Sequence, residues 1–301
     1  MERRTFFQSA LCGAAGIFAA SSSPLQTLSA QTSAAGRLHI AVNQYTANNI
    51  YQRDGKNFLE NFAELKSAGA DGFEPTVGTP AELATIGKQL KDNGLEFPSV
   101  YTGGNLHDAA VADKEAERLL SIGAKGKELG VKYIVFNAAP KQGKTDEELV
   151  LQSKKVDFIG SKFAEYGIIL ALHYHTTELE FGGREFYHLL NGTAPQHLSL
   201  CLEEHWSYRA SGNSQVALFD HLKMFADRIS MVHLRQSTGT VWSETFADGD
   251  IDNVRLAAGL KALNRPLHFV LEQASENGTP KTLPAAEVFR QSCGYIRKVF
   301  A

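Results

Sequence analysis

The sequence has 301 residues, of which 43% are hydrophobic and 21% are charged, and its formal net charge is −3. This composition can bury a large core, which excludes an intrinsically disordered chain. Without a basic excess, the chain also lacks the charge pattern of a nucleic-acid-binding protein. Its length is typical of one α/β barrel.

The N-terminal segment has the pattern of an export signal. Arg3 and Arg4 precede an apolar run of small residues over 10–20, and small polar residues follow up to Ala30. A twin arginine before a modest apolar run is typical of a Tat-type signal peptide. We therefore expect a cleaved signal at 1–30, a linker at 31–37 and a periplasmic protein; a disordered extension is the alternative. The apolar run is too short for a stable membrane span.

From residue 38 onward, short β-rich runs alternate with segments of helical periodicity. The expected strands are 38–43, 72–75, 97–101, 133–137, 168–175, 198–205, 229–235 and 267–273, and the expected helices are 57–68, 80–93, 113–129, 146–166, 184–190, 214–226, 251–263 and 284–300. Alternating strands and helices predict a single-domain (β/α)8 TIM barrel over 38–301. An open doubly wound sheet is the alternative, but no glycine-rich nucleotide-binding loop follows any strand.

Ionisable side chains gather near the carboxyl ends of the last four expected strands. Since side chains alternate between the two faces of a strand, each strand has one face that carries them: Ile169, Ala171, His173 and His175; Ser199, Cys201, Glu203 and His205; Ile229, Met231, His233 and Arg235; His268, Val270 and Glu272. If these faces point into the barrel, His173, Glu203, His233 and Glu272 lie at one depth, and His175, His205 and Arg235 lie nearer the mouth. Glu74 ends the second strand in the same way.

Two imidazoles and two carboxylates at one depth predict a metal site. Isolated buried charges are costly unless they are paired or bind a cation. The mixed nitrogen and oxygen donors suit a divalent ion such as Mn²⁺, Co²⁺, Zn²⁺ or Mg²⁺ and argue against Ca²⁺. The alternative is a structural network in which Glu203 pairs with Arg209 and Glu272 pairs with Arg235. Cys201 and Cys293 lie in apolar contexts without a CxxC motif, so no cysteine zinc site is expected.

At these positions the sequence resembles the xylose isomerase-like barrels of the sugar phosphate isomerase/epimerase superfamily, over nearly all of 38–300. The motifs that carry the resemblance are 69–74 (GADGFE), 172–178 (LHYHTTE), 202–206 (LEEHW), 232–236 (VHLRQ), 249–252 (GDID) and 270–272 (VLE). The resemblance implies metal contacts at Glu203, His233 and Glu272.

The sequence departs from the family pattern on three strands. A His-x-His motif stands on strand five in place of the usual Glu, as in one branch of the family, so the ligand there is His173, His175 or Glu178. Glu203 replaces the usual Asp of strand six. Arg235 replaces a Lys of strand seven, which removes a possible general base because arginine stays protonated.

The resemblance implies proton removal beside a sugar carbonyl, through an enediolate. We expect Glu272, His175 and His205 to move the proton, and a small carbohydrate to contact the side chains of Glu74, Arg209, Arg235, Trp206 and Tyr101. Reprotonation would make the protein an isomerase or epimerase. β-Elimination would make it a 3-keto-glycoside lyase or inosose-type dehydratase. A non-catalytic carbohydrate-binding barrel is the alternative of another class, and relatives of this fold are often homo-oligomers.

Overall fold

A computed structural model describes residues 37–301, so the expected signal at 1–30 and the expected linker up to residue 36 lie outside the described residues. Eight parallel strands form the barrel sheet in the order β2-β1-β10-β7-β6-β5-β4-β3. Their bounds are β1 Ile40–Asn43, β2 Gly72–Glu74, β3 Ser99–Gly104, β4 Tyr133–Ala138, β5 Ile169–His173, β6 Ser199–Glu203, β7 Ile229–Leu234 and β10 His268–Leu271. The isolated bridges Gly72↔Glu96 and Thr76↔Tyr101 bring the β2 and β3 edges together. The predicted (β/α)8 barrel is confirmed.

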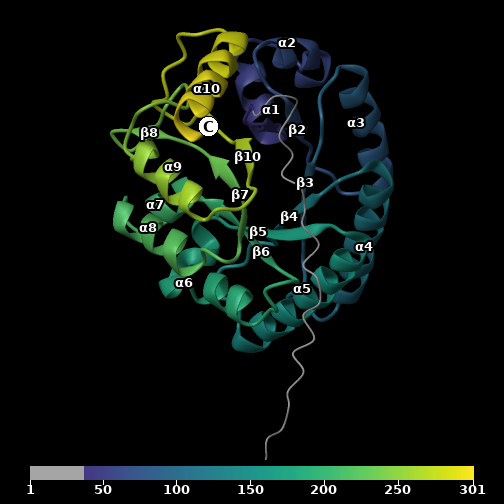
Figure 1. The fold of residues 1–301 in the computed structure, drawn as a ribbon. Coiled ribbons are helices and arrows are strands. Elements are labelled where there is room, and N and C mark those ends of the chain that lie inside the picture. The colour runs from purple at the N-terminus through teal and green to yellow at the C-terminus, as the bar shows by residue number, and fades with distance from the viewer. Residues whose placement is uncertain (1–36) are drawn as a thin grey trace, which may run out of the picture.

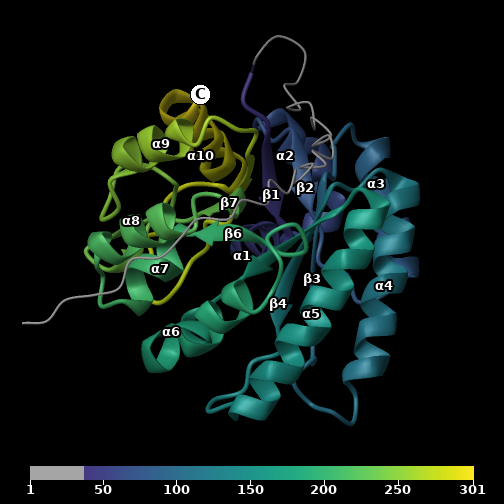
Figure 2. The ribbon, with the colours of Figure 1, turned by 60° about the horizontal axis from the view of Figure 1, so that its bottom comes forward.

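Helices surround the strands, and α3, α4 and α5 lie side by side along one flank (Figures 1 and 2). The helices are α1 Gln44–Arg53, α2 Phe62–Ser67, α3 Pro80–Asp92, α4 Ala112–Leu129, α5 Asp146–Tyr166, α6 Thr176–Asn191, α7 Glu204–Ala210, α8 Gln215–Met224, α9 Asn253–Ala262 and α10 Ala285–Phe300, with a 3-10 turn η1 at Phe58–Glu60. A short antiparallel pair, β8 Ser237–Thr238 and β9 Val241–Trp242, follows β7.

Local sequence explains where the long helices begin and end. Thr79 and Thr145 start α3 and α5 with capping boxes, each completed by a glutamate three residues later. Gly130 and Gly167 end α4 and α5 in the left-handed conformation, with φ of 85° and 72°. Among residues 37–301, no helix is long and apolar enough to cross a membrane.

The apolar core has two parts. A large part packs the outer faces of the strands against the helices. A small part fills the barrel interior with one residue from each of six strands: Ala41, Val135, Ala171, Cys201, Met231 and Val270. This confirms the predicted inward faces of β5, β6, β7 and β10. Ile229 was expected on the inward face but packs in the outer part, because the register shifts between Leu200 and Cys201.

The last four strands of the barrel end earlier than expected. β5 ends at His173, β6 at Glu203, β7 at Leu234 and β10 at Leu271. The residues that follow them, His175, His205, Arg235 and Glu272, therefore lie on the loops or on the first turn of a helix. The short helix α7 begins directly at Glu204 and was not predicted.

Candidate functional site

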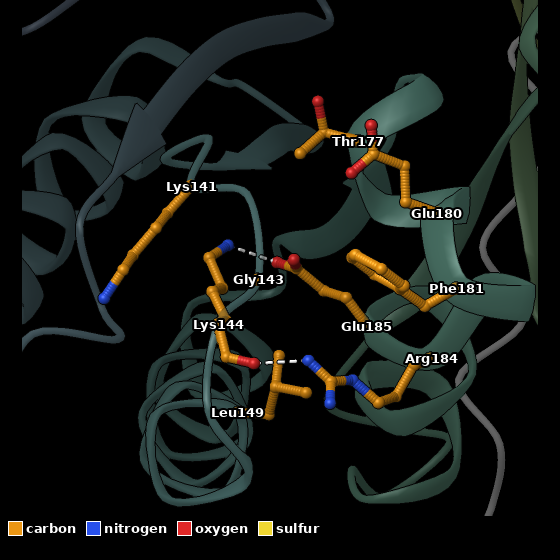
Figure 3. Close-up of a pocket in the computed structure, with 9 residues that line it drawn as sticks. All are labelled: Lys141, Gly143, Lys144, Leu149, Thr177, Glu180, Phe181, Arg184 and Glu185. Carbon is orange, nitrogen blue, oxygen red and sulfur yellow. Dashed lines mark hydrogen bonds and ion pairs between the residues drawn. The ribbon is translucent and has the colours of Figure 1, made fainter.

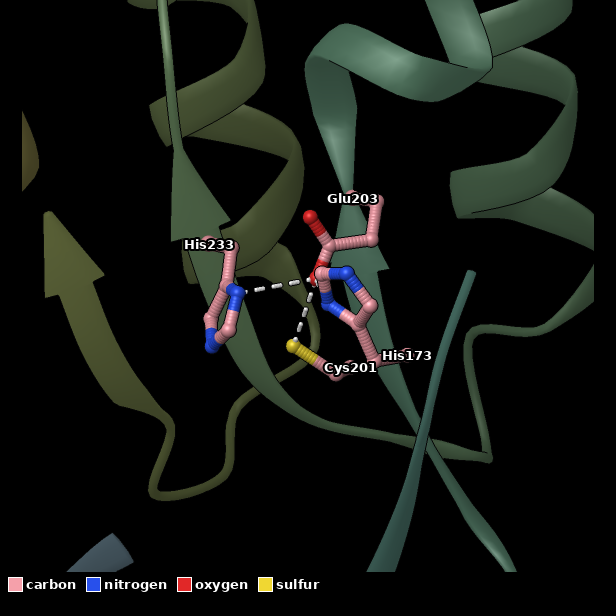
Figure 4. A group of neighbouring side chains, drawn as sticks. All are labelled: His173, Cys201, Glu203 and His233. Carbon is pink, nitrogen blue, oxygen red and sulfur yellow. Dashed lines mark hydrogen bonds and ion pairs between the residues drawn. The ribbon is translucent and has the colours of Figure 1, made fainter. Parts of the chain in front are cut away.

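A carboxylate at the end of β6 lies between imidazoles from the two neighbouring strands (Figure 4). Glu203 Oε1 lies 2.6 Å from His173 Nδ1 at the end of β5 and 3.0 Å from His233 Nδ1 on β7. The β6–β7 register places Glu203 opposite His233. Three side chains that the sequence placed at one depth therefore meet at one carboxylate oxygen.

Burial and charge make this contact a strong ion pair. His173, Glu203 and His233 are all buried. Burial alone would raise the pKa of Glu203, but the imidazoles of His173 and His233 hold it well below its usual value. Burial alone would lower the pKa of His233, but Cys201, Glu203 and Glu74 raise it well above its usual value. An ionised carboxylate thus faces a cationic imidazole.

Cys201 joins this group, and the sequence analysis missed it. Its Sγ lies 3.2 Å from Glu203 Oε1, toward which the thiol points as a donor. Burial raises the pKa of the Cys201 thiol well above its usual value, so the thiol keeps its proton. Strand periodicity could have indicated this contact, because Cys201 precedes Glu203 by two residues and therefore shares the inward face of β6 with it.

The donor set fits a divalent ion. One donor atom from each of His173, Cys201, Glu203 and His233 lies within 4.8 Å of the others. Both ring nitrogens of His233 are buried and have no hydrogen-bond partner within residues 37–301, although Nδ1 lies 3.0 Å from a carboxylate oxygen. A divalent ion would displace the proton of this imidazole, and an imidazole nitrogen beside a carboxylate oxygen is a common pair of ligands for ions such as Zn²⁺.

Glu272 follows β10 and lies between this group and an arginine. Its Oε1 is 3.7 Å from His233 Nδ1, while its Oε2 is 2.9 Å from Arg235 Nη2. Burial alone would raise the pKa of Glu272, but the Arg235 guanidinium lowers it. The expected Glu272–Arg235 pair of the structural alternative is therefore present. The expected Glu203–Arg209 pair is not, because Arg209 makes a bidentate contact with Glu276.

Glu74 lies on the other side of His233. Its Oε1 is 3.2 Å from His233 Nε2 and accepts a hydrogen bond of 2.8 Å from the Asn43 side chain. Its Oε2 is buried without a hydrogen-bond partner among the described residues. Glu74 thus retains a free acceptor oxygen beside the cluster. Asn43, which the sequence analysis did not single out, holds the other oxygen.

The strand-five candidates occupy different places. His175 Nε2 lies 3.1 Å from His173 Nε2, and burial together with His173 lowers the pKa of His175 to about 4. Glu178 accepts a hydrogen bond from the His175 backbone and caps helix α6. The Tyr101 ring meets the His173 ring edge-on at 5.0 Å. His173 is therefore the strand-five side chain in direct contact with Glu203.

The remaining expected contacts lie above this cluster. Trp206 lies near both His175 and Arg235, with ring distances of 5.4 and 5.3 Å. His205 is buried on α7, and burial with the charges of Arg235 and Arg209 lowers its pKa to about 2. Arg209 donates to Glu276 and to the Thr240 carbonyl, so its donors are used within the protein. The roles in catalysis and substrate binding assigned to these residues stay predictions.

A second hollow lies beside the kinked start of α6 and contains none of the expected site residues (Figure 3). Two of its charged side chains are held by neighbours in the lining: Lys144 contacts Glu185, and Arg184 donates to the Lys144 carbonyl. Helical geometry breaks over residues 180–183, and the Phe181 side chain is exposed. This hollow therefore shares no lining residue with the Glu203 cluster.

Comparisons with known proteins agree with this architecture. The chain is 26% identical over 264 residues to the rhizopine catabolism protein MocC of Rhizobium meliloti, covering 80% of this chain and 78% of that protein. A sugar phosphate isomerase/epimerase from Parabacteroides distasonis superposes with a TM-score of 0.70 at 16% identity, covering 88% and 96% of the two chains. A xylose isomerase-like TIM barrel protein from Mycobacterium smegmatis, solved in complex with magnesium, superposes with a TM-score of 0.62 at 12% identity, covering 88% and 96%. The family model described as xylose isomerase-like TIM barrel matches residues 62–299, and the chain belongs to that family.

Proposed function

We propose that this protein is a metal-dependent sugar isomerase or epimerase, which removes a proton beside a carbonyl and returns it to another carbon or another face. The observation that carries the proposal is the buried Glu203 carboxylate between His173 and His233 at the carboxyl ends of the barrel strands. Active sites of TIM barrels lie at this end of the strands. The structural relative from Parabacteroides distasonis is described as a sugar phosphate isomerase/epimerase.

His173, Glu203, His233 and Glu272 are the residues that would hold the divalent ion, whether Mn²⁺, Co²⁺, Zn²⁺ or Mg²⁺. When bound, such an ion supplies positive charge next to the carbonyl oxygen on which negative charge develops. The magnesium complex of the Mycobacterium smegmatis relative supports a divalent ion in this fold. The Glu272 carboxylate lies beside this set, with its Oε1 3.7 Å from His233 Nδ1.

Proton transfer falls to Glu272 and His175. Arg235 keeps the Glu272 carboxyl ionised, so it can accept a proton. His175 has a pKa of about 4 and is therefore neutral near pH 7, with a basic nitrogen available. His205 is a weaker base, since its pKa is about 2. Glu74, with one unbonded carboxylate oxygen, is placed to accept a hydrogen bond from a sugar hydroxyl.

Metal analysis and isotope exchange test the proposal together. The purified protein should contain about one divalent ion by mass spectrometry of the elements, and Glu272→Gln and His233→Ala should each lower that content about tenfold or more. The matched control is Glu276→Gln, which removes a carboxylate paired with Arg209 outside the cluster. Full metal content in both cluster variants would refute the ion site.

Activity is then read by NMR in D₂O with a panel of ketoses, aldoses and 3-keto-glycosides. Exchange of one C–H for C–D, with interconversion and no other mass change, is the expected result. Loss of water or of an aglycone would instead identify the lyase or dehydratase reaction. Bound metal without exchange on any sugar would favour the non-catalytic binding barrel and contradict the proposal.

A further inference from the structure

A buried arginine is surrounded by aromatic rings above the Glu203 cluster. The Arg235 guanidinium lies 4.3 Å from the Trp242 ring, 5.3 Å from the Trp206 ring and 5.9 Å from the Tyr45 ring. Arg235 is 3% exposed, and its guanidinium Nη2 contacts the Glu272 carboxylate. A guanidinium that lies beside three aromatic rings and contacts a carboxylate is ordered before any ligand arrives.

Polar atoms around this arginine lack partners. Trp206 Nε1, Trp242 Nε1 and both ring nitrogens of His205 are buried and make no hydrogen bond within residues 37–301. The three rings form one group, with centroid distances of 6.2 Å for His205–Trp206, 6.1 Å for His205–Trp242 and 6.0 Å for Trp206–Trp242. Buried donors are nearly always satisfied in folded proteins, so unpaired donors in one place indicate a ligand.

The unpaired atoms are mostly donors, and they lie around the Arg235 guanidinium. Each indole offers only an N–H, and a neutral imidazole offers one donor and one acceptor. A hydroxyl group would bring a hydrogen of its own and find few acceptors. A carboxylate brings four acceptor sites, no hydrogen and a negative charge, and therefore matches this set.

We propose that His205, Trp206, Arg235 and Trp242, together the tryptophan–arginine subsite, bind the carboxylate of a sugar acid, so that the substrate is a keto-uronate or related acid. This inference rests on the proposed function and names its substrate class. Two residues connect the subsite to the reacting end: His175 contacts both Trp206 and His173, and Glu272 contacts both Arg235 and His233. A substrate anchored by its carboxylate would thus extend toward the Glu203 cluster.

The test compares D-fructuronate with D-fructose, which differ by a carboxylate in place of a terminal CH₂OH, and includes D-fructose 6-phosphate. Binding is measured by calorimetry on the metal-loaded protein. We expect fructuronate to bind at least about tenfold more tightly than fructose, as for a hydrogen-bonded charge. Trp206→Phe and Trp242→Phe keep an aromatic side chain, although a smaller one, and remove the N–H donors, so each should lower this ratio about fivefold or more. Tyr45→Phe, at the exposed rim of the same arginine, is the matched control and should leave the ratio unchanged.

The outcomes separate this inference from the proposed function. Equal affinity for fructuronate and fructose, or an unchanged ratio in both tryptophan variants, would overturn the inference. Tighter binding of fructose 6-phosphate than of fructuronate would also overturn it, in favour of a phosphate. Exchange in D₂O is followed on the same samples: tight fructuronate binding without exchange on any sugar keeps the inference and refutes the proposed function. Exchange on fructose without tighter binding of fructuronate supports the proposed function and overturns the inference.

Discussion

The hydroxyl of Tyr174 connects β5 and β6 beyond the last residue pair of their ladder. Its removal should loosen the Glu203 cluster. The ladder between the two strands ends at Leu172↔Leu200. Beyond that point the Tyr174 hydroxyl accepts a hydrogen bond of 3.2 Å from the Glu203 N–H and lies 2.7 Å from Ser207 Oγ. The residue is fully buried, so water cannot replace it. Tyr174→Phe removes this bridge while keeping the ring.

The expected cost follows from the groups left behind. The Glu203 N–H loses the Tyr174 hydroxyl, whereas Ser207 keeps a second partner in His221 Nδ1 at 2.9 Å. An unsatisfied buried donor costs about 1–3 kcal/mol. Since the ring remains, no cavity adds to this cost. We expect the free energy of unfolding to fall by about 2 kcal/mol, which lowers Tm by roughly 4–8 °C for a domain of this size.

Denaturant unfolding of the metal-free protein measures the change directly, with Tyr133→Phe as the control. Tyr133 stacks on His268, and no hydrogen bond to its hydroxyl is present among the described residues. Bound metal should also fall in Tyr174→Phe, because the backbone that carries Glu203 is less fixed. Equal stability of the two variants, within about 0.5 kcal/mol, would refute the bridging role of the hydroxyl.

Three further predictions concern acid stability, packing and export. The pKa of His205 is about 2 in the folded protein, so below pH 6.5 only the unfolded chain binds a proton at this histidine. The free energy of unfolding of the wild type should therefore fall by about 2 kcal/mol between pH 7 and pH 5, relative to that of His205→Gln. Denaturant unfolding at both pH values measures the difference. A Cβ on Gly160 would lie 1.9 Å from the His197 carbonyl oxygen, so Gly160→Ala should lower Tm clearly, while Gly294→Ala, which meets nothing within 4 Å, should preserve or raise it. Deletion of 1–30 should keep a reporter fusion in the cytoplasm, and unchanged export would contradict the signal.

Simple periodicity was sufficient to predict the barrel and the inward faces of its later strands. Ala171, Cys201, Met231 and Val270 share parity with the ionisable residues above them, and all four lie in the barrel interior. Because residues two apart on a strand face the same side, this parity also brought His173, Glu203 and His233 together. Ile229 broke the rule, since a register shift between β6 and β7 moves it to the outer face.

The rest of the site could not be predicted, because it lies where strand periodicity ends. Helix α7 begins at Glu204, so His205 follows helical geometry and packs beside Trp206 and Trp242 instead of standing one level above Glu203. Trp242 belongs to a two-residue strand in the loop after β7, and its place over Arg235 depends on how that loop folds back. Alternation along a strand therefore determines which groups form the floor of the site. The residues that surround the floor depend on loops, whose conformations are set by contacts distant in the chain, such as the bond of Arg209 to Glu276.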